Sequence, residues 1–503
     1  MAEVDDANNT LIMKKIMLTA ALIFSAALTS YAQNDADVQR YTANYFAGTA
    51  RFEAMGGAFG ALGGDMSALH INPAGVGVFR FGEISFTPGY EFNTINAATD
   101  FSSREDAMSK MVVNNLGFVL ANEIDHPQWK SVNFSVSYNR INTFNDITRL
   151  TGQSTALNGL AGDFLEEASG RFLDELNDFG AGLAWDALVI DNANFTDSAL
   201  VDDGAYVMGF DPDEPIETTQ SSERDGRLSE TALTIGANYD DRLFLGFGLG
   251  FQDVSYQSVV ETTEEPVGAP AQDLTRYTLT ERLQSEGLGV NARFGMIYKL
   301  DNIRFGASVR TPTVFSMTDN FTSDIVSRFQ NPTETFEAQS DAGFFEYRIR
   351  TPWHFMGSVA GVLGKKAILS AQYERIDFAG GELRNSSSSA DADFSEINDF
   401  INQSYSASDI FRLGGEYRIS KSFSARAGFA YFANPITANE QTTDEDLNRQ
   451  EINFGLGYRL ATWYIDVSYS RATFNELYNY TLLNRAVLEN TQSVFGLTVG
   501  IRM

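Results

Sequence analysis

Apolar and polar residues alternate with a two-residue period through most of this chain. The last segment is typical: Phe495, Leu497, Val499, Ile501 and Met503 fall on one face, and Gly496, Thr498, Gly500 and Arg502 on the other. This period indicates a β-strand whose two faces meet different surroundings. In a soluble protein the apolar row would face a core, but no second sheet is evident that could cover so much apolar surface.

Fourteen segments follow this pattern, and an even number suits a closed antiparallel barrel. They begin near residues 83, 115, 131, 231, 243, 277, 303, 345, 367, 409, 423, 451, 463 and 493. We therefore predict an all-β fold, a 14-stranded antiparallel transmembrane β-barrel.

The connections between these segments alternate between short and long. Short ones lie at 122–130, 240–242, 299–302, 364–366, 419–422 and 460–462, and long polar ones at about 94–113, 141–230, 253–276, 316–344, 379–408, 432–450 and 470–492. This alternation is typical of a barrel in the outer membrane of a Gram-negative cell, with turns on the periplasmic side and loops outside. The 39 Phe and 20 Tyr suit aromatic girdles at the two membrane interfaces. The alternative is a soluble β-sandwich with aromatic residues in its strands.

The first 32 residues are predicted to be removed from the mature protein. Met13 to Lys15 form a basic start, residues 16–29 are apolar, and Ser30 and Ala32 are the small residues of a signal-peptide cleavage site. Residues 1–12 fit no targeting pattern, so we expect the true start at Met13. No later apolar run approaches the roughly 20 residues that a membrane helix needs.

Composition argues against several functions. The net charge of −30 argues against a nucleic-acid partner, and the absence of cysteine excludes thiolate and disulfide chemistry. There is no G-x-S-x-G motif, and the histidines have no metal-ligand partner at usable spacing. The repeat Asp391-x-Asp393-x-Ser395 lacks the glycine and distal glutamate of a calcium loop. We expect no enzyme activity, metal or cofactor, with an esterase or protease site assembled across strands as the alternative.

One long connection is predicted to contain a helix. Apolar residues recur at helical spacing from Leu157 to Phe179 in an otherwise polar segment, which favours an amphipathic helix across the outer mouth. Packing of the loop on itself is a simpler role for this helix than contact with a ligand.

Strand parity predicts which side chains face the interior of the barrel. Such inward arginines suit the carboxylate or other anionic head group of a ligand, and a charge network with inward glutamates is the alternative. The strand that holds Gly246, Gly248 and Gly250 would present a smooth inward face that leaves room in the lumen. The inward residues are Arg293, Arg304, Arg310, Arg412 and Arg426, with Gln372, Glu374 and Glu416.

A segment of small residues precedes the first strand. Residues 49–81 are rich in glycine and alanine and contain Asn72-Pro73-Ala74, where proline fixes a sharp turn. Together with the signal peptide and the fourteen strands, this segment resembles the FadL/TodX family of outer-membrane hydrophobic-compound channels. The phrase MGGAFGALGGDMSALHINPAG looks like the variant common in Bacteroidetes-type members.

The resemblance implies three regions: an N-terminal extension and signal peptide (1–32), a hatch inside the lumen (33–82) and the barrel (83–503). It implies a monomer in outer-membrane lipid that takes up long-chain fatty acids or aromatic hydrocarbons passively, past the hatch and out through a lateral opening. The matching hatch residues are Asn72, Pro73 and Ala74 with Gly56 and Gly57, and Tyr45 and Phe46 lie where ligand contacts are expected.

Some relatives have other functions, which leaves two alternatives open. One is an outer-membrane scaffold or protein-secretion subunit. The other is a haemin-binding receptor, for which His70 or a tyrosine would have to supply the axial ligand.

Overall fold

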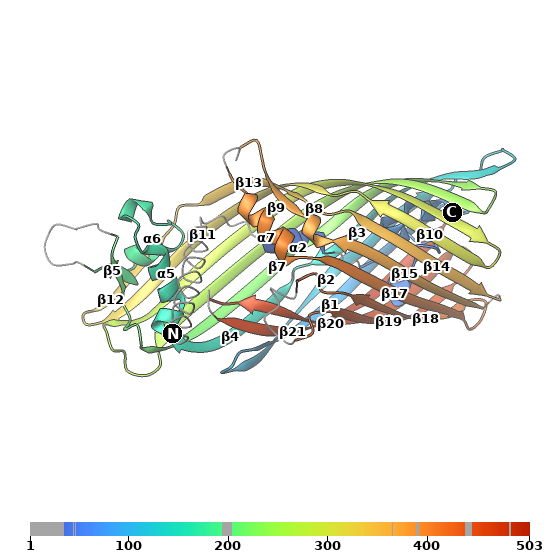
Figure 1. Ribbon diagram of the computed structural model, residues 1–503. Coiled ribbons are helices and arrows are strands. Elements are labelled where there is room, and N and C mark those ends of the chain that lie inside the picture. Colours follow the sequence, from blue (N-terminus) through green and yellow to red (C-terminus); the bar gives the residue numbers. More distant parts are fainter. Residues whose placement is uncertain are drawn as a thin grey trace, which may run out of the picture.

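Fourteen antiparallel strands close into a barrel (Figure 1). The computed structural model describes residues 35–43, 45, 47–193, 204–364, 366–388, 392–437, 445–481 and 484–503. The predicted signal peptide and Phe46 therefore lie outside the described residues. Each barrel strand pairs with the next, and β21 pairs with β1, which closes the barrel and confirms the predicted fold class. The barrel strands are β1 (Glu83–Ala98), β2 (Ser103–Leu120), β3 (Trp129–Thr143), β7 (Pro215–Tyr239), β8 (Leu243–Pro266), β9 (Leu274–Leu300), β10 (Ile303–Arg310), β14 (His354–Leu363), β15 (Ala367–Asp377), β17 (Ala407–Arg418), β18 (Phe423–Phe432), β19 (Arg449–Arg459), β20 (Trp463–Asn479) and β21 (Arg485–Arg502).

The wall continues past breaks in several strands. Beyond Pro312, for example, β11 pairs with β9 and β13, and Pro352 separates β13 from β14. Proline has no N–H for the ladder, so a break in the strand is expected at both positions. The strands that extend the wall are β4 (Asp146–Thr155), β11 (Val314–Gln330), β12 (Thr333–Gln339), β13 (Gly343–Arg350) and β16 (Glu382–Asn385).

Parts of several predicted loops are therefore strands, and the predicted lengths of these loops and of the neighbouring strands are wrong. Strand β9 has 27 residues, whereas about 11 residues cross a bilayer. Residues 217–224 in the outer part of β7 are polar on both faces, so they carry no alternation that a sequence pattern could detect. The barrel thus rises well beyond the membrane on the side of the long connections.

An apolar band surrounds the barrel. On β21 the side chains of Phe495, Leu497, Val499 and Ile501 are exposed, while Thr498 between them is buried in the interior. The same alternation of exposed apolar and buried polar or small residues runs along β1. A closed barrel with such a band is a transmembrane barrel of the Gram-negative outer membrane. Exposed aromatic residues of the barrel strands include Tyr90, Phe92, Tyr298, Tyr373, Tyr417 and Trp463, as aromatic girdles require.

The long connection after β4 forms a small cap of its own at one end of the barrel (Figure 1). The single helix predicted over residues 157–179 is wrong in extent, because α5 (Leu160–Ala168) ends just before Gly170, whose φ is +79°. Its apolar residues pack against other parts of the loop and the ends of β9 and β11, as loop packing requires. The cap also contains η2 (Ala156–Asn158), η3 (Leu173–Glu175), α6 (Ala181–Asp186), β5 (Ile190–Asn192) and β6 (Tyr206–Met208).

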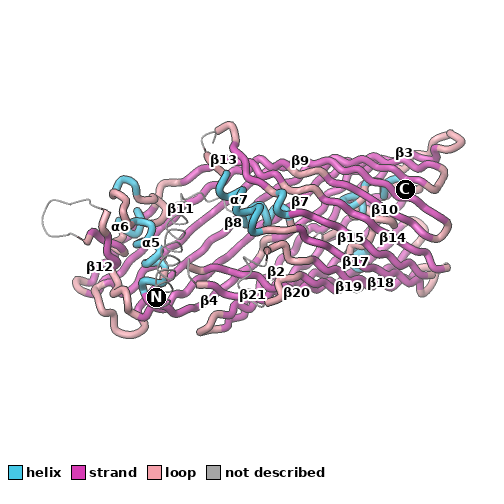
Figure 2. Tube along the Cα trace, viewed as in Figure 1, coloured by secondary structure: helices cyan, strands magenta, loops and turns pink. Residues whose placement is uncertain are grey.

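The N-terminal segment lies inside the barrel. Its elements are α2 (Asp35–Thr42), α3 (Ala50–Ala54), α4 (Ala68–Ile71) and η1 (Pro73–Val78), and strands surround them (Figure 2). Helix α3 contacts β18 to β21, whereas η1 contacts β3, β7, β8 and β9 on another part of the wall. The segment therefore spans the lumen. Two further short helices, η4 (Phe378–Gly380) and α7 (Ser395–Ser404), belong to the connection between β15 and β17. Within the described residues, no helix is both long and apolar enough to cross a bilayer.

Candidate functional site: the hatch and the chamber above it

The Asn-Pro-Ala motif is a capped turn pinned to the barrel wall. The Asn72 side chain accepts a hydrogen bond from the Ala74 N–H (3.1 Å) and donates to the carbonyls of Gly60 (2.7 Å) and Met296 (3.1 Å). Pro73 is the first residue of η1, where its missing N–H would have no helical partner. Asn72 thus fixes the turn and ties it to β9.

Wall glycines let the backbone of residues 47–82 approach closely; this later part of the predicted hatch (33–82) is called the hatch from here on. A Cβ at Gly246 would lie 2.2 Å from the Ala74 nitrogen, and one at Gly428 would lie 2.1 Å from the Gly56 nitrogen. Gly56 has a φ of +61° and Gly57 a φ of +73°. Such positive φ values favour glycine at both positions. The glycines of β8 were predicted to leave room in the lumen. At Gly246 the hatch occupies that room.

A chain of buried polar groups joins the hatch to several strands. His70 Nδ1 of α4 lies 2.9 Å from Glu230 Oε1, and the other oxygen of Glu230 pairs with Arg293. On its other side, His70 Nε2 lies 3.4 Å from Arg310 Nη1. The series of polar contacts continues from Arg310 to His354 and then through Glu374 to Arg412.

Both ring nitrogens of His70 contact side chains of this polar series, Nδ1 with Glu230 and Nε2 with Arg310. Its side chain is buried, and burial lowers the pKa of the imidazole to about 4, so it is neutral at neutral pH. Because both nitrogens face protein groups, His70 has no free position for the iron of haemin. The geometry disfavours the haemin alternative at this residue. Within the described residues there is also no cluster of potential metal ligands, although Asp391 lies outside them.

The inward arginines all face the interior, as parity predicts, and each contacts protein. Arg304 donates to the Leu62 carbonyl of the hatch (2.7 Å), and Arg426 pairs with Glu416 and Asp466. Arg412 pairs with Glu374 (2.8 Å), and Arg293 with Glu230. These contacts fit the charge-network alternative, and a direct role of the four arginines in ligand binding stays a prediction.

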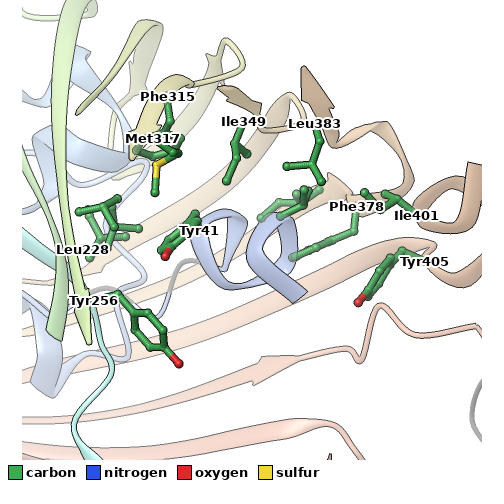
Figure 3. Close-up of a cluster of buried hydrophobic side chains, with 14 of the residues drawn as sticks. Tyr41, Leu228, Tyr256, Phe315, Met317, Ile349, Phe378, Leu383, Ile401 and Tyr405 are labelled. Carbon is green, nitrogen blue, oxygen red and sulfur yellow. The ribbon is translucent and has the colours of Figure 1, made fainter. Parts of the chain in front are cut away.

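A large chamber lies above the hatch, on the side of the long connections. Its volume is about 640 Å³, within the usual range for small-molecule sites. Helix α2 forms part of its lining, and Tyr41 of α2 points toward an apolar cluster that includes Phe315 and Met317 (Figure 3). Much of the lining is apolar or aromatic: Phe144, Tyr256, Ile376, Phe378, Ile410 and Phe432.

Tyr45 stands where the chamber meets two smaller cavities. It lines all three spaces, and its ring packs edge-to-face on Phe432 at 5.4 Å. One small cavity continues between the hatch and β17 and β18, and the other runs toward Arg140 on β3. Its position supports the prediction that Tyr45 contacts a ligand, which stays a prediction.

The barrel wall is split beside the β3 residues 140–143, which line the second small cavity. The β2–β3 ladder extends only from Leu120↔Phe134 to Asn115↔Asn139. Beyond that point β2 pairs with β1 alone and β3 with β7 alone among the described strands. Beyond the end of β3 the wall continues with β4, and there the side chain of Arg149 on β4 contacts Asp106 on β2.

A bulge at Asn114 connects this split to the hatch. Asn114 is the extra residue where the β1–β2 register shifts, and its side chain is buried in the interior. Its Nδ2 donates to Glu53 Oε1 of α3 (2.9 Å), and its Oδ1 accepts from Arg140 (3.1 Å). Sequence reasoning missed this site, although the consecutive polar pair of Asn114 and Asn115 interrupts the alternation of β2.

Glu53 is the titratable group at this junction. Its carboxylate also accepts from the Gly48 N–H (3.1 Å) and the Ser468 hydroxyl (2.7 Å). Burial outweighs these hydrogen bonds and raises the pKa of Glu53 to about 7.

We expect the docking of α3 to weaken as the pH rises. A carboxyl whose pKa is higher in the folded state binds its proton more tightly there, and this stabilises the folded state at low pH. The stabilisation is lost as the pH rises from the unfolded-state pKa to the folded-state pKa. Hydrogen-exchange protection factors of α3 amides should fall about tenfold between pH 6 and pH 8. In Glu53→Gln the fall should disappear, and equal pH dependence in both proteins would contradict the assignment.

The arrangement can be compared with known proteins. No protein-family model matches the chain, and no curated protein matches it in sequence. Among solved structures, the Pseudomonas putida toluene transporter TodX is similar with a TM-score of 0.51 and 13% identity, over 90% of this chain and 98% of that one. A Pseudomonas aeruginosa FadL homologue gives 0.53 and 12%, over 91% and 99%. The chain has the fold of the FadL/TodX outer-membrane channels. At this identity the likeness shows the fold, and the FadL-type fold accounts for a barrel of this size built around an N-terminal segment.

Proposed function

We propose that this protein is an outer-membrane channel for the passive uptake of a hydrophobic small molecule, and that it is not an enzyme. The observation that carries the proposal is the chamber of about 640 Å³ above the hatch, together with the small cavity beside it, which is lined by Tyr45 and by residues 140–143 of β3, where β3 no longer pairs with β2. The hatch fills the lumen below the chamber, so the straight route along the barrel axis is blocked for an apolar solute. A lateral exit delivers such a solute into the membrane, where it is most soluble.

The names of the similar structures support this class of function. One is a toluene transporter and another a FadL homologue, so both neutral aromatic compounds and fatty acids are reasonable ligands for this FadL-like chain. The ligand binds as a small molecule to a monomer, and no energy source is needed because transfer out of water drives the apolar solute into the chamber and the membrane.

The first test is whether the chamber carries a ligand. Mass spectrometry of the protein purified in mild detergent should find an apolar molecule at a stoichiometric level. A barrel that is reproducibly empty and binds neither fatty acid nor aromatic hydrocarbon would contradict the proposal.

The second test closes the split. The chain has no cysteine, so a pair introduced as Asp106→Cys and Arg149→Cys would be the only thiols. The Arg149 N–H of β4 donates to the Asp106 side chain of β2 at 3.1 Å, so the two residues face each other where the split continues between β2 and β4. Joining them with a short bifunctional thiol reagent closes the proposed lateral exit. Uptake of labelled dodecanoate or toluene by whole cells should then slow at least about tenfold.

The control for this closure uses the intact part of the same ladder. Leu116→Cys and Tyr138→Cys replace paired residues of β2 and β3 where the strands are already hydrogen-bonded. Joining that pair should leave uptake unchanged. If both pairs slow uptake equally, or neither does, the split is not the exit.

A further inference from the structure

Three arginines lie together on the outer face of the barrel wall. Arg348 and Arg350 point outward from β13, with the buried Ile349 between them, and Arg384 points outward from the neighbouring β16. Arg348 and Arg384 are directly opposite each other in the β13–β16 ladder, and both are exposed. Like charges directly opposite on neighbouring strands repel, so an anion between these two side chains would stabilise the pair.

The carboxylates nearby do not balance these arginines. Glu382 Oε1 lies 2.7 Å from Arg350 Nη1 and also pairs with Arg384, so one carboxylate serves two arginines. Arg348 forms no ion pair with any other described residue. Glu346, the next outward residue of β13, accepts a hydrogen bond from a serine hydroxyl. The cluster is therefore a local excess of positive charge on a protein with a net charge of −30.

The register of the ladders places the cluster at the upper edge of the apolar band. Arg350 shares a row with Val314 of β11 and Val290 of β9. Arg348 belongs to the next outward row, which includes Leu288 of β9. All three of these apolar side chains are exposed toward lipid. The outward residues of the row above are polar on all three strands: Glu346, Thr318 and Glu286. The arginines thus lie where lipid head groups meet the wall.

Apolar surface lies beside and below the arginines. Leu288 is 70% exposed. The exposed rings of Trp353 and Phe355, which follow β13 toward the membrane, are stacked with their centres 6.4 Å apart. This part of the wall combines a charged upper region with an apolar lower region, as the phosphate and the acyl chains of one membrane lipid require.

We propose that Arg348 and Arg384 bind a phosphate monoester of a glycolipid in the outer leaflet of the outer membrane. Two opposed guanidinium groups can each donate to the oxygens of one phosphate, and the bound phosphate also removes the repulsion between them. The acyl chains lie along exposed apolar residues such as Leu288 and Trp353. A phosphorylated glycolipid is the occupant that fits, because the cluster is on the side of the long connections and so faces the outer leaflet. This site is on the outside of the barrel and does not depend on the proposed uptake.

The experiment compares two forms of one glycolipid. Lipid A with both phosphates and lipid A from which both phosphates have been removed are titrated into the full-length protein in mild detergent, and bound lipid is counted by native mass spectrometry. The unaltered protein should bind the phosphorylated form about thirtyfold more tightly, the scale of two arginine contacts with an anionic lipid. Equal binding of the two forms would overturn the proposal.

Variants then assign that preference to the two arginines. Arg348→Gln combined with Arg384→Gln should bind both forms equally, whereas Arg348→Gln alone should keep a preference of about fivefold. Replacing both residues with lysine should keep part of the preference, because lysine retains the charge but not the planar fork. The control is Arg227→Gln on β7. Arg227 is an exposed arginine that pairs with Asp253, opposite Leu288 in the ladder, and its loss should leave the preference unchanged.

A third lipid tests the source of the phosphate. Phosphatidylglycerol has a diester with a single negative charge, so it should bind at least about tenfold more weakly than phosphorylated lipid A, whose monoesters carry more charge. Equal binding of these two lipids would show a site for any phospholipid and overturn the assignment to a glycolipid. A phosphate preference that persists in the double glutamine variant would overturn the role of the arginines. If that variant does not insert, Arg348→Gln alone decides the same question, since it breaks no ion pair among the described residues.

Discussion

Replacing Gly246 with alanine is expected to release the η1 part of the hatch from the wall while the barrel stays folded. The new Cβ would lie 2.2 Å from the Ala74 nitrogen and 2.4 Å from the Pro73 carbonyl oxygen. Both atoms belong to backbone that the Asn72 hydrogen bonds hold in place, so neither can rotate away. Overpacking of this kind costs about 1–3 kcal/mol, and more where backbone must move.

Limited proteolysis measures this release. A protease added to the purified variant should cut within residues 47–82, which are protected in the unaltered protein, and planar-bilayer recordings should show an increased conductance. The strands of the barrel should remain uncut, because the outward face of β8 is unchanged.

The neighbouring glycine of the same row supplies the control. A Cβ at Gly248 would meet nothing closer than 3.5 Å, the Thr234 hydroxyl, which is ordinary van der Waals contact. Gly248→Ala should therefore keep the hatch protected and the conductance low. If the two alanine variants behave alike, close packing at Gly246 does not hold the hatch.

The second large effect is expected at the ion pair beneath His70. In Arg293→Met the buried Glu230 carboxylate keeps its contacts with His70, Gln252 and Asn291 but loses its cation. Removing one partner of a buried pair costs about 3–5 kcal/mol, because the remaining charge is left uncompensated. Urea unfolding in detergent should show this loss.

A double substitution separates the lost pair from lost packing. Arg293→Met combined with Glu230→Gln should be more stable than the single Arg293→Met variant, since no unpaired charge remains. The control is Arg282→Met on the same strand, whose pair with Asp324 is exposed and should be worth less than about 1 kcal/mol. Additive losses in the double variant would show that the two residues do not act as a pair.

The strand count could be predicted from the sequence because lipid imposes it. A residue such as Leu497 must be apolar where it meets the membrane, and Thr498 beside it must suit the interior, so alternation marks every crossing. Above the membrane this demand ends, and the outer half of β9 gave no comparable signal. That difference explains why the number of strands was right and their lengths were not.

The site was less predictable because its contacts are distant in the sequence. Parity placed Arg293 inside, but its partner Glu230 lies 63 positions earlier on another strand. The turn at Asn72 to Ala74 could be predicted from proline, whereas its anchor, the carbonyl of Met296, could not.

The two docking surfaces of the hatch have a consequence for assembly. Helix α3 rests on β18 to β21, which include the last strands of the chain, and η1 rests on strands from β3 to β9. Neither half of the lumen offers both surfaces until β21 has joined β1. Docking of the hatch and closure of the barrel therefore stabilise each other, since only the closed barrel offers the hatch both surfaces at once. A hatch docked in the lumen therefore indicates that the barrel has closed. A chain whose assembly stops before closure leaves its N-terminal segment exposed to periplasmic proteases.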